Sequence, residues 1–169
     1  MNENREIVVV GNCGVAGTIY LLESRREELN HHFPPFFLNQ VAALEDLPRL
    51  DLEFAKGDYD IESATKRGIL GALWDLKRKR NIGITFELTA IPVFQEVIEL
   101  TEYFHMNPYC LLSKDVSVIL TLDAPSILSM AHDAGVTAAI IGRTNDSKQI
   151  MDISFENPRY ITKNPRASL

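Results

Sequence analysis

The sequence predicts an α/β (α+β) domain in which amphipathic helices cover a mixed sheet. Short apolar runs rich in β-branched residues alternate with segments of helical periodicity, and each such segment is apolar on one stripe only. At 169 residues, of which 46% are hydrophobic, the chain is long enough for one sizeable core. No internal repeat or linker divides it, so we expect a single domain over residues 1–169, with an extended tail from about residue 156.

The charge and the cysteine content limit the classes of function. The net charge is −6 and the only basic run, residues 77–80, is a helix end, so no nucleic-acid partner is expected. Cys13 and Cys110 lie far apart, and no segment resembles a signal peptide or a membrane span. The adjacent His31 and His32 point in different directions on a helix, so we expect no metal site. These features indicate a cytoplasmic protein without a membrane partner.

The first elements are a strand and two helices. Residues 7–10 form a continuous β-branched run that is typical of a buried strand. Helical spacing of apolar residues predicts one helix over residues 19–30 and a short one over residues 37–44, which Pro48 ends. Residues 51–59 are acidic and are expected to be irregular.

The segment from residue 60 to residue 80 organises the middle of the chain. Ile69, Leu73 and Leu76 recur at helical spacing, and the cations of residues 77–80 complement the negative end of the helix dipole. We expect residues 60–67 to form a polar turn that leads into this helix.

The second half of the chain alternates regularly between strands and helices. The strands that its apolar pattern predicts are residues 84–89, 116–122, 138–141 and 151–155. One helix is expected to begin at Pro92 and another after Asp123 as N-cap. Gly135 is expected to close the second of these in a left-handed conformation, and Gly142 to end the strand after it.

A glycine-rich turn after strand 7–10 is the first candidate site. Gly14 and Gly17 permit close approach of the backbone to a ligand, and together with Thr18 they are candidates for binding a phosphate. The turn lacks the ending of a P-loop and fits a dinucleotide fingerprint poorly. Cys13 in this turn is either a reactive thiol at a helix N-terminus or, as is more common, a small buried side chain.

The start of the central helix is the second candidate site. Free backbone N–H groups and the positive end of the helix dipole, joined by Ser63, Thr65, Lys66 and Gly68, are able to hold a phosphate or carboxylate. Thr65 is also a candidate helix cap. The simpler interpretation is an ordinary capped amphipathic helix that packs closely on the sheet through its glycines, and the residues alone favour it.

Several motifs occur in one order along the chain and together carry a family resemblance. They are Gly17-Thr18, Phe33-Pro34, Thr65-x-x-Gly68-x-x-Gly71-Ala72-Leu73-Trp74, Gly83, Ile91-Pro92, Asn107-Pro108-Tyr109 and Ala138-Ala139-Ile140-Ile141-Gly142. Over roughly residues 5–160 the chain resembles the C-terminal domain of the aminoimidazole ribonucleotide (AIR) synthetase-related superfamily, and within it the hydrogenase-maturation-like proteins.

The resemblance implies a ferredoxin-like, mixed sheet in a domain that is normally the second half of a two-domain protein. Members of the family bind Mg-ATP mainly through an N-terminal half that supplies metal-binding aspartates, and they activate an oxygen or selenium atom by phosphorylation. The C-terminal half closes the cleft, and its Asp-x-Thr-x-Gly-Gly segment helps to shape the site. The residues before Ile7 are too few to form the other half, so Mg-ATP is expected as a cofactor only together with a partner half.

The chain departs from the family motif at this segment. With Thr65 and Gly68 laid on the pattern, Ser63 replaces the aspartate, Arg67 replaces the first glycine and Glu62 stands where a histidine is common. Serine removes a potential metal or proton ligand, and arginine blocks close approach of the backbone while it adds a charge.

Two further departures concern other parts of the chain. Lys114-Asp115 stands where the family often has Ser-Gly or Glu-Gly before a strand. The sequence ends at Leu169 without the terminal cysteine of the hydrogenase-maturation members, so carbamoyl transfer to such a thiol is not expected.

Three functions from different classes follow. In the first, the domain is not catalytic alone and acts as a binding or regulatory domain that self-associates, as a homodimer, through an uncovered apolar surface. In the second, it is the C-terminal half of a split ATP-dependent phosphoryl-transfer enzyme, with Thr65, Lys66 and residues 14–18 facing a phosphate and the ATP-binding domain in another chain. The third is an unrelated small-molecule binder with the same fold, which a closed pocket around Asp60, Thr65 and Arg67 would indicate. No catalytic residue is assigned.

Overall fold

The elements follow one another in an alternating order. The structure is a computed structural model that describes residues 4–50, 52 and 59–169. Its strands are β1 (Glu6–Val10), β2 (Tyr59–Ser63), β3 (Gly83–Phe86), β4 (Ser117–Thr121), β5 (Ala138–Asn145), β6 (Ile150–Asp152) and β7 (Arg159–Ile161). Its α-helices are α1 (Val15–Ser24), α2 (Arg26–His32), α3 (Pro35–Ala43), α4 (Gly68–Arg80), α5 (Gln95–Tyr103) and α6 (Ala124–Asp133). Short 3-10 turns are η1 (Leu44–Asp46), η2 (Leu88–Ala90) and η3 (Pro108–Cys110).

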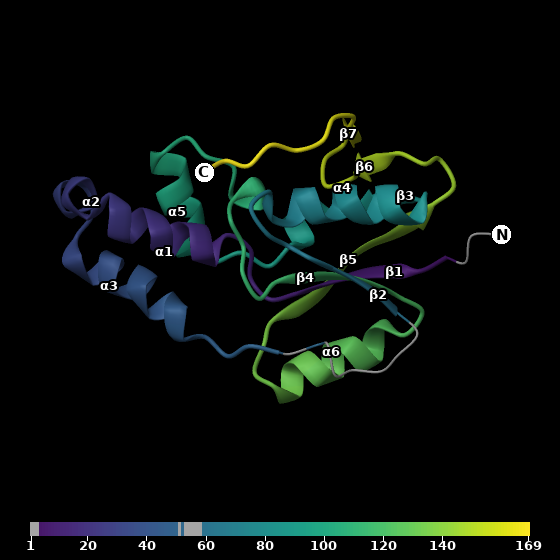
Figure 1. Cartoon of the computed structure of the whole chain (residues 1–169), viewed down its shortest axis with the longest axis horizontal. Helices are drawn as coiled ribbons and strands as arrows, with labels where there is room; N and C mark the ends of the chain where they lie inside the picture. The colour runs from purple at the N-terminus through teal and green to yellow at the C-terminus, as the bar shows by residue number, and fades with distance from the viewer. Residues whose placement is uncertain (1–3, 51, 53–58) are drawn as a thin grey trace.

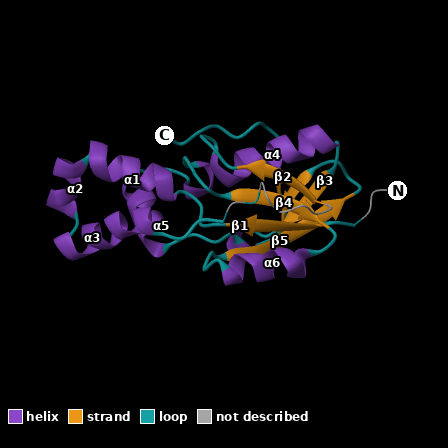
Figure 2. Ribbon diagram, turned by 60° about the horizontal axis from the view of Figure 1, so that its bottom comes forward, coloured by secondary structure: helices purple, strands orange, loops and turns teal. Residues whose placement is uncertain are grey.

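The strands form one mixed sheet in the order β2-β4-β1-β5-β3-β6-β7. Neighbours in it are antiparallel except β3 and β6, which are parallel. Figures 1 and 2 show α4 on one face of the sheet, α6 on the other, and α1, α2, α3 and α5 together beyond one end. This arrangement confirms the predicted fold class. No helix among the described residues has both the length and the apolar character that crossing a membrane requires.

β1 lies inside the sheet between β4 and β5, and the side chains of its apolar run are buried on both faces. Ile7 and Val9 belong to a buried cluster with the apolar stripe of α4, whereas Val8 and Val10 pack in a second cluster with α6. Successive side chains of a strand point to opposite faces, so a strand that is apolar throughout needs a covering layer on both sides. The helices beyond the sheet enclose a third cluster around Leu29 and its neighbours.

Several predicted element bounds are wrong for local reasons. The strand expected over residues 151–155 ends at Asp152, whose carboxylate accepts hydrogen bonds from the Ser154 N–H and hydroxyl. Residues 19–30 belong to two helices rather than one, because Arg25 has φ −120° and leaves the helical conformation. The helix expected at Pro92 begins only at Gln95, after an extended Phe94. The strand expected over residues 84–89 ends at Phe86 and is followed by a 3-10 turn.

Residues 60–63 of the expected polar turn belong to a strand instead, and only residues 64–67 make the turn into the central helix. β2 pairs with β4 in antiparallel register over its whole length. Asp60 and Glu62 form ion pairs with Arg80 and Lys79 at the end of α4, and Ser63 is the last residue of the strand. β2 lies at the edge of the sheet. Hydrogen bonds to β4 therefore hold this strand in place although its side chains have no apolar pattern.

The two predicted caps of α6, Asp123 and Gly135, are confirmed. The prediction that Gly142 ends its strand is wrong. The Asp123 carboxylate accepts a hydrogen bond from the Ser126 N–H, and Gly135 has φ +70°. β5 continues through Gly142, where a Cβ would lie 2.1 Å from the Thr85 carbonyl oxygen, so glycine here permits close strand pairing. The tail, expected to be extended, contains β7 and then returns to η3, where the Ser168 N–H donates to the Cys110 carbonyl.

Candidate functional site

The glycine turn between β1 and α1 is closed by contacts within the chain. Gly14 is the N-cap of α1 with φ +76°, and its N–H donates to the Ser113 hydroxyl at 2.8 Å. The Gly17 N–H donates to the Leu112 carbonyl at 2.8 Å. The Thr18 hydroxyl is buried and donates to the Gly14 carbonyl. These groups therefore hold the turn against the segment before β4.

Cys13 lies in this turn with no exposed surface. Burial raises the pKa of its thiol to about 12, so the thiol stays protonated at neutral pH and the reactive thiolate does not form. This favours the interpretation of Cys13 as a small buried side chain.

The start of α4 packs on the same segment from the other side. Gly68 has φ +61°, and a Cβ there would lie 2.5 Å from the Tyr109 carbonyl oxygen. Its N–H donates to the Thr65 carbonyl, and no side chain caps the helix. The expectation that Thr65 caps α4 is therefore wrong, since its side chain accepts no bond from the first turn. The two glycine-bearing helix starts enclose residues 108–113 between them.

A groove lies beside the first turn of α4, and we name it the tail groove. It is lined by Thr65, Lys66, Arg67, Asn164, Pro165, Arg166 and Ala167. Arg67 forms an ion pair with Asp75 and donates to the Asn164 side chain, which fixes the tail over the helix start. Lys66 and Arg166 are exposed and form no ion pair with any residue of the described ranges. Of the predicted candidates, Thr65, Lys66 and Arg67 thus meet in one groove.

Other predicted site residues lie apart from this groove. Asp60, Glu62 and Ser63 are in β2, and both carboxylates of this strand are paired with cations. Thr65 and Arg67 line the tail groove but Asp60 does not, so this groove is not a closed pocket around all three residues. Within the described ranges, no group of three His, Cys, Asp or Glu side chains is placed to hold a metal ion.

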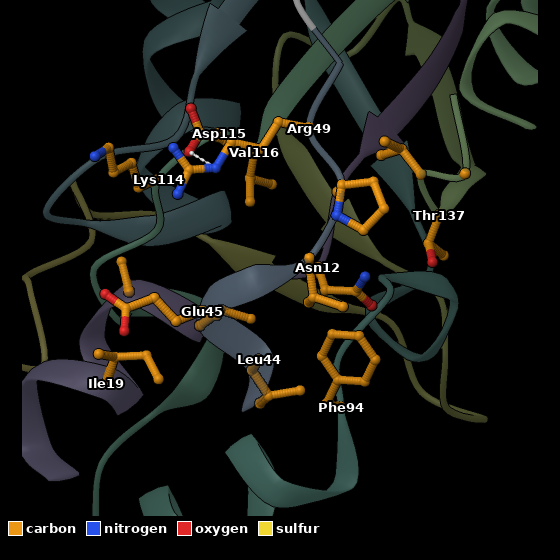
Figure 3. Close-up of a pocket in the computed structure, with 17 residues that line it drawn as sticks. Asn12, Ile19, Leu44, Glu45, Arg49, Phe94, Lys114, Asp115, Val116 and Thr137 are labelled. Atoms are coloured by element: carbon orange, nitrogen blue, oxygen red, sulfur yellow. Dashed lines mark ion pairs between the residues drawn. The ribbon is translucent and has the colours of Figure 1, made fainter. Parts of the chain in front are cut away.

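A second cavity is lined in part by the glycine turn, and we name it the α1 cavity (Figure 3). Its volume is about 260 Å³. Its lining residues come from segments far apart in the sequence: Gly11, Asn12, Val15, Ala16, Ile19, Leu44, Glu45, Leu47, Pro48, Arg49, Phe94, Lys114, Asp115, Val116, Gly135, Val136 and Thr137. The cavity therefore forms only when these distant segments pack together in the folded chain, and no single loop forms it.

Charged groups stand around an apolar interior in the α1 cavity. Arg49 and Asp115 form an ion pair at 3.1 Å, with both side chains partly exposed. Glu45 and Lys114 also line the cavity. Sequence reasoning missed this site because Arg49 and Phe94 carry no motif; the departure at Lys114-Asp115 and the polar Asn12 beside Gly11 were the available signals.

Comparison with known proteins gives the family. Residues 3–152 match the sequence model described as AIR synthase related protein, C-terminal domain. A protein of Methanocaldococcus jannaschii named for hydrogenase expression/formation is 30% identical over 146 residues, which are 84% of this chain and 42% of that protein. The hydrogenase maturation protein HypE of Escherichia coli has the same fold, with a TM-score of 0.71 and 18% identity over 97% of this chain and 51% of that one. A HypE structure in complex with ATP gives a TM-score of 0.70 and 18% identity, over 94% of this chain and 50% of that one. The chain thus spans about half the length of these relatives.

Proposed function

Because this chain belongs to the AIR synthase-related family as its C-terminal domain, we propose that it is a binding domain that is not catalytic alone. In this proposal it works with an ATP-binding half that these 169 residues do not include. The relatives support the proposal, since the chain covers only 42% of the M. jannaschii protein and 50% of the HypE that was crystallised with ATP.

The observation that carries the proposal is the tail groove. Lys66 and Arg166 are cations without a carboxylate partner in the described part of the chain, and they stand beside the N-terminal end of a helix of 13 residues. The first N–H groups of such a helix and its dipole both favour an anion. A phosphate brought by the other half would therefore meet charge of the opposite sign here.

The test is isothermal titration of the purified chain with Mg-ATP, combined with an assay of ATP hydrolysis. We expect binding that weakens as salt is raised, because the groove is exposed, and no hydrolysis above the buffer background. Ligand at about a hundred times its dissociation constant should add about 2.7 kcal/mol of stability, which the thermal midpoint would report.

Lys66→Ala should weaken this binding several-fold, since it removes one cation from the groove. Lys163→Ala is the control, because Lys163 is an exposed lysine of the neighbouring tail that does not line the groove, so this variant removes the same charge outside the site. Equal effects of the two variants would contradict the groove as the phosphate site. Hydrolysis by the chain alone would contradict the non-catalytic role.

Self-association is a second candidate function, and one exposed apolar region favours it. Ile140 and Ile153 are 40% and 42% exposed and line one groove beside Thr85 and Arg143 on the sheet. Sedimentation should show a dimer that Ile153→Glu dissociates, whereas the same change at Phe36, which is 73% exposed on α3, should leave it intact. A monomer in the unmodified chain would contradict this candidate.

A further inference from the structure

The α1 cavity is independent of the tail groove, because the two share no lining residue. Its interior is lined mainly by the apolar side chains of Val15, Ile19, Leu44, Val116 and Val136. A cavity of roughly 150 Å³ in another protein is large enough for benzene. At about 260 Å³ the α1 cavity has room for a flat molecule of one or two rings.

Asn12 supplies a free amide to this cavity. Its backbone is fixed on both sides, because the Gly11 N–H donates to the Thr137 carbonyl at 2.7 Å and the Cys13 N–H to the Pro92 carbonyl at 3.0 Å. The side chain makes no hydrogen bond with any described residue. It is half-buried, so its amide is not cut off from solvent. The amide is therefore open to whatever occupies the cavity, as one donor beside one acceptor.

Phe94 supplies an aromatic face at the same end of the cavity. It is the extended N-cap residue of α5, and its carbonyl accepts from the Val97 and Ile98 N–H groups, which fixes its position. Figure 3 shows its ring and the Asn12 amide at one end of the cavity, with the Arg49–Asp115 ion pair at the other. A flat ring stacks on such a face and presents its edge to the amide.

The charges around the cavity favour a neutral ligand. Arg49 and Asp115 neutralise each other, and Lys114 and Glu45 have opposite signs, so the formal charge of the lining is zero. An anion that left water for this site would gain no net Coulomb attraction to offset its desolvation.

From these features we infer that the α1 cavity binds a neutral heteroaromatic ring that carries adjacent hydrogen-bond donor and acceptor groups. The ring stacks on Phe94, its edge pairs with both groups of the Asn12 amide, and the apolar wall of α1 covers its second face. A purine or pyridine carboxamide has this chemistry, and the site is a binding site without a chemical step.

The test uses adenine as the probe on the full chain, by isothermal titration and by saturation-transfer NMR. We expect a dissociation constant on the order of 1 mM or lower for a ligand of this size. N6,N6-dimethyladenine, which lacks the donor, should bind about tenfold more weakly, because the Asn12 oxygen then loses its partner. No binding at about 10 mM adenine by the folded chain would overturn the inference.

A variant that fills the cavity separates this site from others. Ala16→Phe places a ring in the cavity from the first turn of α1 and should abolish adenine binding. Ala42→Phe makes the same change on an exposed position of α3 outside the cavity and should leave binding unchanged. Thermal midpoints confirm that both variants are folded, and adenine binding that survives Ala16→Phe would overturn the inference. Lys66→Ala should not alter adenine binding, so the outcome does not depend on the tail groove.

Discussion

Replacing Gly17 by alanine tests whether the glycine turn serves packing. A Cβ at this position would lie 2.4 Å from Cγ and 2.9 Å from Cδ1 of Leu111, whereas carbon atoms pack best at about 3.5–4.0 Å. Leu111 has no exposed surface and cannot swing away into solvent. Overpacking of this kind costs about 1–3 kcal/mol, and the better helix propensity of alanine returns up to about 1 kcal/mol. We expect Gly17→Ala to lower the free energy of unfolding by about 1 kcal/mol.

A double-mutant cycle with Leu111→Ala makes this prediction specific. Leu111→Ala alone should cost about 2–5 kcal/mol, because it leaves a cavity at a buried position. In that background the clash is gone, so Gly17→Ala should become stabilising by up to about 1 kcal/mol. The two substitutions are therefore expected to couple by about 2 kcal/mol.

Urea unfolding followed by circular dichroism measures all the free energies of this cycle. Leu73→Ala is the control partner, since Leu73 is equally buried but packs in the cluster under α4. Its combination with Gly17→Ala should be additive within about 0.5 kcal/mol. Additivity with Leu111→Ala as well would refute the packing explanation. If Gly17 instead approaches a phosphate, Gly17→Ala would lower Mg-ATP affinity whichever residue stands at position 111.

Three more predictions rest on single contacts. Because burial raises the pKa of Cys13 to about 12 and also raises that of Cys110, neither thiol should react with Ellman's reagent at about pH 8 until guanidinium unfolds the chain; native-state reaction would contradict the burial. The hydrogen bond from Arg25, and after it the one from Tyr103, lowers the pKa of Glu28. Tyr103→Phe should therefore destabilise the protein above about pH 4.5, and this destabilisation should vanish as the pH falls through the lowered pKa of Glu28. Thermal midpoints between about pH 3 and pH 7 check the sign, and a loss that is equal at every pH would contradict it. Asp123→Ala removes the cap of α6 and should cost about 1 kcal/mol in urea unfolding. Asp133→Ala at the other end of α6 should cost nothing, and equal costs would contradict the capping role.

The sequence predicts the apolar strands and helices well because burial imposes their pattern. β1 and β4 are buried on both faces, and their continuous β-branched runs follow from that position. β2 escapes prediction because it lies at the sheet edge, where paired backbone and ion pairs of Asp60 and Glu62 replace apolar contacts. The same holds for β7 in the tail, whose side chains are mostly exposed.

The candidate site is harder to predict because its contacts are distant in sequence. The helix expected from residue 19 begins already at Val15, so Gly14 and Gly17 lie at its start. The groups that accept hydrogen bonds from their N–H groups are the Ser113 hydroxyl and the Leu112 carbonyl. No local pattern around residue 14 reports a partner some hundred positions away. Thr65, Lys66 and Arg67 gain a groove only because the tail returns to them through Asn164. That they bind a phosphate stays a prediction.

The pairing of β1 has a consequence for synthesis in the cell. Its hydrogen-bonding neighbours are β4 and β5, so Val8 meets Ile119 and Ile140. At about 5–20 residues per second, a ribosome needs on the order of ten seconds to deliver these strands after β1 has emerged. During that time the apolar run Ile7 to Val10 has no partner strand. Such long-range pairing also slows folding, because the chain between the strands loses entropy on closing into a loop before the contacts between the strands stabilise it. The first strand is therefore expected to stay without its partner strands until both β4 and β5 have been made.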